Sequence, residues 1–263
     1  MTACWTVVDR QQQVVSRDLA AESWDWLPIR WAETTEEAGL YLEWDDGLCL
    51  KSTELDARSS VRVDFLLGAQ ARRLHAVTGE ALTRAMGCQK GLRPAICDAT
   101  AGLGSDASVL ANVGCEITAF ERSEVVAALL ADGLRRAREA GCVWCDRMQL
   151  RHADATAYLA HIDHGVIYLD PMFPKERKAQ PGLAMQLLHQ LPESTSSPDD
   201  LFVAAMDSNA ARVVVKRPLK APALAGSTPS SQIRGKAIRF DLYPRRKLAE
   251  HDAEPLRVPV VLP

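Results

Sequence analysis

Acidic residues and glycines recur along the chain at positions that suit the binding of a nucleotide-like ligand. In the string CDATAGLGSDA, Asp98 precedes a turn that contains Gly102 and Gly104. Two glycines allow a sharp turn and a close approach of the backbone to a ligand. Glu121 follows at the end of the next apolar run, at the offset of about 20 residues that is usual for a carboxylate holding ribose hydroxyls. The pattern predicts a nucleotide-like ligand at the ends of two parallel strands.

The residues after the glycine turn discriminate between ligands. A dinucleotide site normally shows G-x-G-x-x-G, with a helix N-terminus that faces a pyrophosphate. Here Ala107 takes the third position, and Asp106 would place a carboxylate beside that pyrophosphate. A negative charge better suits a ligand with a cationic or neutral head, such as S-adenosylmethionine (SAM) with its sulfonium and ammonium groups. A nicotinamide-dependent Rossmann oxidoreductase and a tight turn without any ligand remain alternatives.

The string YLDPMFPK suits work on a planar exocyclic amine. An apolar strand ends at Asp170, and two prolines stiffen a short loop that displays Phe173. The carboxylate would accept a hydrogen bond from the amine, while the aromatic ring stacks on the base. We therefore predict that Asp170 and Phe173 are catalytic. A proline turn that merely closes a strand is the alternative.

These acids can lie close together only if strands and helices alternate along the chain, because the strands then run parallel and end at one edge of the sheet. Their alternation predicts an α/β fold with a mainly parallel sheet, covered on both faces, whose ligand crevice lies outside the carboxyl ends of the strands. Residues 65–86 favour two helices ahead of this run. The strands are expected over 94–98, 116–121, 147–154, 165–170, 212–216 and 236–243, and the helices over 106–112, 124–140, about 183–191 and about 199–209.

The ends of the chain differ from its middle. Residues 1–60 contain five of the six tryptophans, and AGLYLEWDDGLCLKS alternates around the turn signal Asp46–Gly47 as a hairpin does. We expect three parts: a β-rich N-terminal elaboration over 1–60, the main domain over 61–245, and an irregular proline-rich tail over 246–263.

Composition narrows the class of protein. The 263 residues are 47% hydrophobic and 25% charged, as in ordinary globular proteins. No apolar run approaches the roughly 18 residues of a membrane span, and the first residues do not resemble a secretion signal. Seven scattered cysteines favour reduced thiols and a cytoplasmic protein. Cys142 and Cys145 form a CxxC, but zinc would need two more ligands at suitable spacing, so no metal is expected.

Charge is distributed unevenly around the net value of -3. Residues 1–60 hold five Lys/Arg against twelve Asp/Glu, whereas residues 211–250 hold ten against two. The imbalance excludes a uniformly basic coat for nucleic acid but leaves room for a local basic face.

Several uncommon sequence strings occur in an order that is typical of one protein family. DATAGLGSDA, ERSEVVAALL, LDPMFP and VVVKRP together resemble the bacterial ribosomal RNA small-subunit methyltransferase J family, over about residues 63–243. The resemblance implies a Rossmann-like class I SAM-dependent methyltransferase that methylates the exocyclic N2 of a guanosine in 16S rRNA. It implies S-adenosyl-L-homocysteine as the second product and the small ribosomal subunit as partner, with no membrane and no obligatory protein partner.

The resemblance also implies cofactor contacts, whereas the RNA contacts are predicted from the charge and position of basic residues. The cofactor contacts join those of the glycine turn, and the basic residues around the proposed site are expected to bind RNA phosphates, which gives affinity without sequence information. Where this chain has Asp154, the family often has Ser, and we hypothesise that Asp154 bonds the adenine amine. The cofactor set is Asp98, Gly102, Gly104, Ser105, Asp106, Glu121, Arg122, Asp154, Ala155 and Asp170, and the RNA set is Arg72, Arg73, Lys175, Arg177, Lys178, Lys216 and Arg217.

Two further alternatives stay open at this point. One is amino methylation of another substrate, DNA adenine or a protein amide, although those families usually show N-P-P-Y/F and Asp170 stands here in place of the Asn. The other is a non-catalytic RNA-binding module with a decayed pocket.

Overall fold

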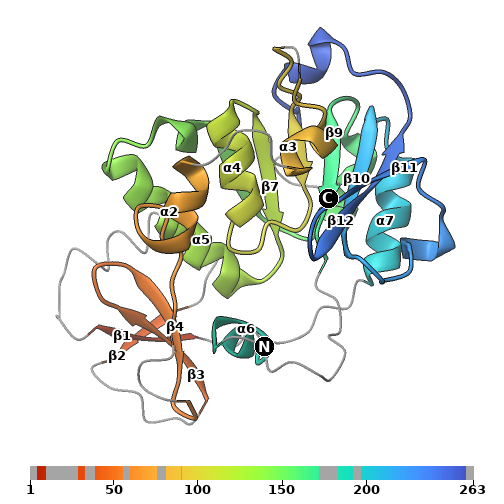
Figure 1. The fold of residues 1–263 in the computed structure, drawn as a ribbon. Helices are drawn as coiled ribbons and strands as arrows, with labels where there is room; N and C mark the ends of the chain where they lie inside the picture. Colours follow the sequence, from red (N-terminus) through yellow and green to blue (C-terminus); the bar gives the residue numbers. More distant parts are fainter. Residues whose placement is uncertain are drawn as a thin grey trace.

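The structure is a computed structural model that describes residues 5–9, 29–32, 39–55, 60–75, 81–89, 91–171, 183–191 and 197–258. Within these residues the strands form a seven-stranded sheet and a five-stranded sheet, which Figure 1 shows meeting at helix α5. The larger sheet carries the predicted site.

The seven-stranded sheet has the order β11-β12-β10-β9-β6-β7-β8. Strands β6 to β10 run parallel, and β12 lies antiparallel between β10 and β11. This arrangement confirms the predicted α/β fold with a mainly parallel sheet. The strands are β6 (Ile96–Asp98), β7 (Ile117–Glu121), β8 (Met148–His152), β9 (Val166–Leu169), β10 (Arg212–Pro218), β11 (Ser231–Arg234) and β12 (Ile238–Pro244).

Helices cover both faces of this sheet, with α4 and α5 on one face and α7 on the other (Figure 1). Side-chain signals begin two of them: Ser123 caps α5, and Ser197 forms a capping box with Asp200 at α7. The α-helices are α2 (Gly68–His75), α3 (Ala81–Met86), α4 (Ser105–Val113), α5 (Glu124–Glu139), α6 (Leu183–Leu188) and α7 (Pro198–Asp207). The 3-10 helices are η1 (Val143–Arg147), η2 (Ala155–Ala157), η3 (Leu159–His161), η4 (Leu224–Gly226) and η5 (Glu250–Ala253).

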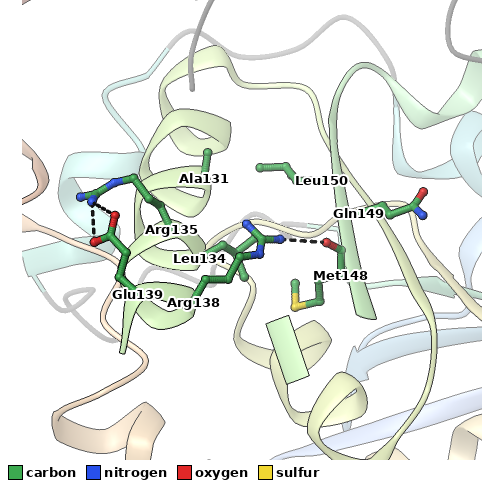
Figure 2. A pocket seen from close by; sticks show the side chains of 8 residues that line it. All are labelled: Ala131, Leu134, Arg135, Arg138, Glu139, Met148, Gln149 and Leu150. Carbon is green, nitrogen blue, oxygen red and sulfur yellow. Dashed lines mark hydrogen bonds and ion pairs between the residues drawn. The ribbon is translucent and has the colours of Figure 1, made fainter. Parts of the chain in front are cut away.

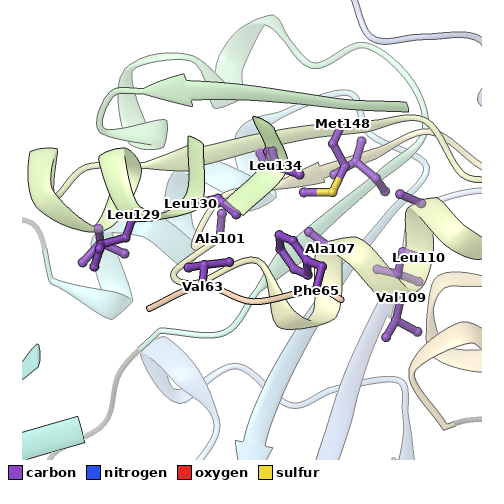
Figure 3. Close-up of a cluster of buried hydrophobic side chains, with 14 of the residues drawn as sticks. Val63, Phe65, Ala101, Ala107, Val109, Leu110, Leu129, Leu130, Leu134 and Met148 are labelled. Carbon is purple, nitrogen blue, oxygen red and sulfur yellow. The ribbon is translucent and has the colours of Figure 1, made fainter. Parts of the chain in front are cut away.

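The core lies on both faces of the seven-stranded sheet. Successive side chains of a strand point to opposite faces, so Tyr168 of β9 joins one buried cluster while Ile167 and Leu169 join the other. Figure 3 shows part of the first cluster, in which Val63 and Phe65 pack beside Leu130 of α5. The segment that leads into α2 is thereby fixed against the glycine turn.

The five-stranded sheet has the order β2-β1-β3-β4-β5. Strands β3 and β4 pair as the hairpin predicted around Asp46 and Gly47, and Asp46 takes a positive φ of 52° there. Strand β5 crosses the expected boundary at residues 60 and 61, and the division into domains stays a prediction. The strands are β1 (Trp5–Asp9), β2 (Ile29–Ala32), β3 (Leu40–Trp44), β4 (Leu48–Ser52) and β5 (Ser60–Val61).

A buried carboxylate on α5 anchors the hairpin to the larger sheet. Asp132 is fully buried and accepts hydrogen bonds from the backbone N–H of Leu48 at 3.0 Å, from Arg135 at 2.9 Å and from Arg136 at 2.8 Å. Close by, the Trp5 indole N–H donates to Glu124 at 2.6 Å, at the first turn of α5. The two sheets are thus joined by specific polar contacts.

Two further features concern helix α6 and the C-terminal segment. Helix α6 packs on β4 and β5 of the smaller sheet (Figure 1). In the C-terminal segment, Asp252 of η5 is fully buried, pairs with Arg246 at 2.7 Å and accepts the N–H of Gly165 at 2.7 Å. Among the described residues, no helix is both long and apolar enough to span a bilayer.

Candidate active site

Parallel register brings the predicted acids to one edge of the larger sheet. Asp98 lies beside Tyr168, two residues before Asp170, and Glu121 lies beside His152, two residues before Asp154. Parallel strands end together at this edge, where α/β proteins bind their ligands. The four carboxylates therefore lie at the same edge of the sheet.

The glycine turn is held against the end of β7. Gly102 and Gly104 have φ values of 54° and 74°, which residues with a Cβ rarely adopt. Glu121 accepts the N–H of Gly102 at 2.9 Å and that of Ser123 at 2.7 Å. A Cβ at Gly104 would lie 2.6 Å from Leu130, whereas at Gly102 nothing lies nearer than a carbonyl oxygen at 4.0 Å. The backbone at Gly102 is thus open to a ligand.

Asp98 stabilises the start of the glycine turn. Its side chain is 2% exposed and accepts the N–H of Thr100 at 3.0 Å, while the Thr100 hydroxyl accepts the N–H of Asp170 at 2.6 Å. Burial, with smaller contributions from Asp106, Asp170 and Glu121, raises the pKa of Asp98 to about 8 against the opposing hydrogen bond from the Thr100 N–H. Thr100 thus links the glycine turn to the end of β9. Sequence reasoning missed Thr100, although it lies within the string that drew attention to the turn.

Asp106 faces the protein rather than an open pocket. It is 8% exposed and contacts the Tyr168 hydroxyl at 2.5 Å, Arg73 at 2.7 Å and Lys216 at 2.9 Å. Burial raises the pKa of Asp106, but Lys216, Arg73 and the Tyr168 hydroxyl outweigh it and leave the pKa below its ordinary value. The sequence pattern places this carboxylate beside the ligand's head, and that contact stays a prediction. In the structure Arg73 and Lys216 pair with Asp106.

Lys216 joins Asp106 to Asp170. Its ammonium lies 2.9 Å from Asp106 and 2.7 Å from Asp170, whose side chain is 36% exposed. Burial raises the pKa of Asp170 above its ordinary value, and Lys216 offsets part of that increase. Burial lowers the pKa of Lys216, but the two carboxylates outweigh burial and hold it above its ordinary value. A partly accessible carboxylate with a fixed cation behind it can orient a polar hydrogen of a substrate.

Comparison with known proteins identifies the family. The family model for SAM-dependent methyltransferases matches residues 28–245. A ribosomal RNA small subunit methyltransferase J from Marinobacter nauticus is 41% identical over 245 residues, which cover 89% of this chain and 88% of that protein. The chain belongs to the ribosomal RNA small subunit methyltransferase J family.

Other members and a solved structure agree. A methyltransferase J from Stutzerimonas stutzeri is 43% identical over 210 residues, 77% of this chain and 81% of that protein. The crystal structure of a SAM-dependent methyltransferase from Neisseria gonorrhoeae matches with a TM-score of 0.71 at 31% identity, over 92% of this chain and 96% of that one. The protein is therefore a SAM-dependent methyltransferase, and the nicotinamide-dependent oxidoreductase is excluded.

The structure fits the cofactor of methyltransferase J enzymes. Glu121 is fixed by two N–H groups at the end of β7, beside an open backbone at Gly102. Burial raises the pKa of Glu121, although the N–H groups of Ser123 and Gly102 oppose the increase. Glu121 thus has a position suited to ribose hydroxyls. Glu121 and the partly exposed Asp170 place carboxylates at this edge, which suits the cationic groups of SAM.

The remaining cofactor predictions lie around the same edge. Ser105 and Arg122 are exposed. Asp154 caps η2 by accepting the N–H of Thr156 at 2.9 Å, and Ala155 is buried at 3% exposure. Their contacts with SAM stay predictions of the methyltransferase J resemblance.

The RNA contacts predicted from the basic residues are dispersed in the structure. Arg72 is exposed, but Arg73 pairs with Asp106 and Lys216 is held between two carboxylates. Arg217 is 4% exposed and donates to the carbonyl of Pro222, so its guanidinium is covered by protein. Burial and ion pairing thus leave Lys216 and Arg217 poorly placed to bind phosphates. Phe173, Lys175, Arg177 and Lys178 lie outside the described residues.

A surface pocket of about 550 Å³ lies elsewhere, between α5 and β8 (Figure 2). Its apolar floor includes Leu134 and Met148, and its arginines are engaged: Arg135 pairs with Glu139 at 2.7 Å, and Arg138 donates to the carbonyl of Met148 at 3.4 Å. Its lining residues from β8 are the first three of that strand, away from the strand's carboxyl end. This pocket is separate from the proposed methyltransferase J site.

Proposed function

We propose that this protein transfers the methyl group of SAM to the exocyclic N2 of a guanosine in 16S rRNA of the small ribosomal subunit. One observation carries the proposal: the partly exposed Asp170 is hydrogen-bonded through Thr100 to the glycine turn that opens toward the cofactor. The names of the curated relatives supply the substrate class. Ribosomal subunits are cytoplasmic, and we propose the same location for this protein.

Asp170 orients the acceptor amine in this proposal. Its carboxylate accepts a hydrogen bond from N2, which raises the electron density of the nitrogen and points its lone pair at the methyl group. Lys216 is a positioning residue that keeps Asp170 ionised and fixes its direction. Phe173 stacks on the guanine ring.

The cofactor residues act on the other side of the transferred group. SAM supplies a methyl group on a cationic sulfur that departs as a neutral thioether, and the methylated nitrogen then loses its extra proton to water. The rate advantage therefore comes mainly from positioning. Glu121 holds the ribose, Asp154 bonds the adenine amine, and the backbone at Gly102 approaches the ligand closely. Asp98 and Asp106 act indirectly, since one supports Thr100 and the other holds Lys216.

Methyl transfer to ribosomal subunits from cells that lack this protein tests the proposal. Radiolabelled SAM should yield N2-methylguanosine in 16S rRNA on nucleoside analysis. Asp170→Ala should abolish transfer while cofactor affinity changes only modestly, and Asp170→Asn tests whether the charge is needed beyond an acceptor oxygen. Label in another nucleoside, in DNA or in protein would contradict the substrate assignment. Near-normal turnover by Asp170→Ala would remove Asp170 from the mechanism.

A further inference from the structure

Positive charge gathers at one end of the antiparallel strand β12. No acidic residue occurs from residue 208 to residue 240, a stretch that contains seven Lys/Arg. Three of these cations, Lys220, Arg234 and Lys236, are exposed. We refer to these three residues as the β12 basic surface.

Strand register places the β12 basic surface at the catalytic edge. Leu169, the residue before Asp170, lies beside Val215 of β10. Further along β10, Pro218 lies beside Ile238 at the start of β12, and Arg234 lies beside Arg239 of the same strand. Neighbouring strands are about 4.8 Å apart, so β11 lies roughly 10 Å from β10. The surface therefore extends outward from the side of the sheet edge that holds Asp170.

The buried Arg239 and a turn at Gly235 fix the backbone that carries this surface. Arg239 is 5% exposed and donates to the carbonyls of Pro218 at 2.8 Å, Leu219 at 2.7 Å and Ala221 at 2.8 Å. These bonds fasten the loop that carries Lys220. The N–H of Gly235 donates to the carbonyl of Ile238 at 2.8 Å and closes the turn that carries Lys236. The exposed cations thus stand on an ordered base.

The acids near the β12 basic surface bond other groups and do not pair with its three cations. Asp241 is 1% exposed and pairs with the buried Arg239 at 2.8 Å. Asp199, at the start of α7, accepts the N–H of Ala225 at 2.8 Å and borders the surface on that side. No salt bridge shorter than 4.0 Å joins Lys220, Arg234 or Lys236 to an acid within the part of the chain that the structure describes.

We propose that Lys220, Arg234 and Lys236 bind backbone phosphates of the RNA strand that flanks the guanosine held at Asp170. The inference rests on the proposed function and adds the face on which the RNA lies. Phosphate contacts of this kind fix the register of the RNA without reading its bases. RNA is preferred over an acidic protein as the occupant because the surface adjoins the site where the nucleotide must enter.

Two pairs of exposed cations near the opposite ends of β12 provide a matched comparison. Arg234→Gln with Lys236→Gln neutralises the catalytic end of β12, and Arg245→Gln with Lys247→Gln removes the same charge just beyond its opposite end, where both residues are also exposed. Binding to naked 16S rRNA would be measured over a salt series, alongside cofactor affinity and thermal unfolding. Each lost phosphate contact lowers the salt slope by about 0.7 to 0.9.

The first pair should lose RNA affinity, with a salt slope lower by roughly 1.5, and Lys220→Gln should add to the loss. The second pair should bind RNA as the wild type does, and all variants should bind SAM normally. Equal losses in both pairs, or no loss in the first, would overturn the proposal. A defect on whole subunits but not on naked rRNA would indicate a protein partner and also overturn it. Nucleoside analysis of the wild-type product tests the proposed function separately.

Discussion

Lys216 shows how one side chain can tie a structural acid to a catalytic one. Its ammonium contacts Asp106, which is nearly buried, and Asp170, which is partly exposed. Removing the cation would leave two carboxylates without their shared partner, an arrangement that proteins tolerate poorly. The lysine therefore belongs with the chemistry of the site, although its position in VVVKRP first suggested a phosphate contact.

Lys216→Met should lower kcat while leaving the KM for RNA little changed. Loss of a charge-assisted hydrogen bond costs about 1.5–3 kcal/mol, which corresponds to roughly 10- to 100-fold. Without Lys216, the pKa of Asp170 should rise further, so the acid limb of the kcat–pH profile should move to higher pH. Lys216→Arg keeps the cation and should restore the profile. An unshifted acid limb in the Met variant would show that Lys216 does not act through Asp170.

Asp98 should make the fold less stable as pH rises. Its folded pKa of about 8 lies above the ordinary 3.8, so its contribution is fully present below about pH 4 and is lost as pH rises toward 8. The loss is at most about 1.4 kcal/mol per pH unit. Asp98→Asn keeps an acceptor for Thr100 but cannot ionise, and urea denaturation from pH 5 to pH 9 should show a flatter dependence. Parallel curves for the two proteins would refute this assignment.

At the residue scale, the sequence indicated where the acids lie better than how exposed the cations are. Asp98, Glu121 and Asp170 stand where apolar runs end, so strand pairing alone carries them to one edge. The alternation of a strand also decides burial: Lys216 and Arg217 are neighbours, yet one faces the site and the other is covered. Spacing in the sequence cannot show which face a strand buries at its end. Tyr168 and Thr100 were missed because their roles depend on partners far along the chain.

The turn between β6 and α4 contains two glycines with different duties. Gly104 sits against α5, where a Cβ would clash with Leu130, while the space beside Gly102 is open. Gly104 serves packing, and Gly102 leaves room for a ligand. The same element therefore combines a stability requirement with a binding requirement.

Alanine substitutions should separate these two duties. Gly104→Ala should destabilise the protein by about 1–3 kcal/mol through overpacking, with further strain from the positive φ. Gly102→Ala should lose less stability but more affinity for SAM, because its new methyl group occupies the open side of the turn. Urea denaturation and cofactor titration would measure the two effects. The reverse ranking would mean that the ligand does not approach Gly102.

At the element scale, patterning located helices and strands but not all their partners. Each strand expected in the larger sheet is present, whereas β11 was missed because SQIR has little apolar alternation at an exposed sheet edge. The periodicity of residues 183–191 indicated a helix, which α6 confirms. Periodicity marks an apolar face without naming the sheet it covers, and α6 covers the smaller one.

The whole molecule depends on how its two sheets are joined. Asp132 is inaccessible to solvent and binds both the hairpin N–H of Leu48 and two arginines of its own helix. Its removal would take the ion pair from the largely buried Arg136 and leave Arg135 with Glu139 alone. The joint is therefore a point at which a single change affects both sheets.

Asp132→Ala should destabilise the protein by about 3–5 kcal/mol, the usual cost of breaking a buried ion pair. Glu139→Ala removes the other acidic partner of Arg135, but its side chain is 58% exposed and the change should cost no more than about 1 kcal/mol. Equilibrium unfolding in urea would compare the two. Similar losses in both variants would show that burial at Asp132 carries no special weight.

The placement of α6 bears on how far the protein can be shortened. The chain leaves the larger sheet after Asp170 and Pro171, and α6 then rests on β4 and β5 before α7 returns to the larger sheet. The described residues on either side of Phe173 are thus held by different sheets: Asp170 follows β9 of the larger sheet, and α6 packs on the smaller one. Removing the N-terminal strands would take away the support of α6, so the smallest active unit should include them.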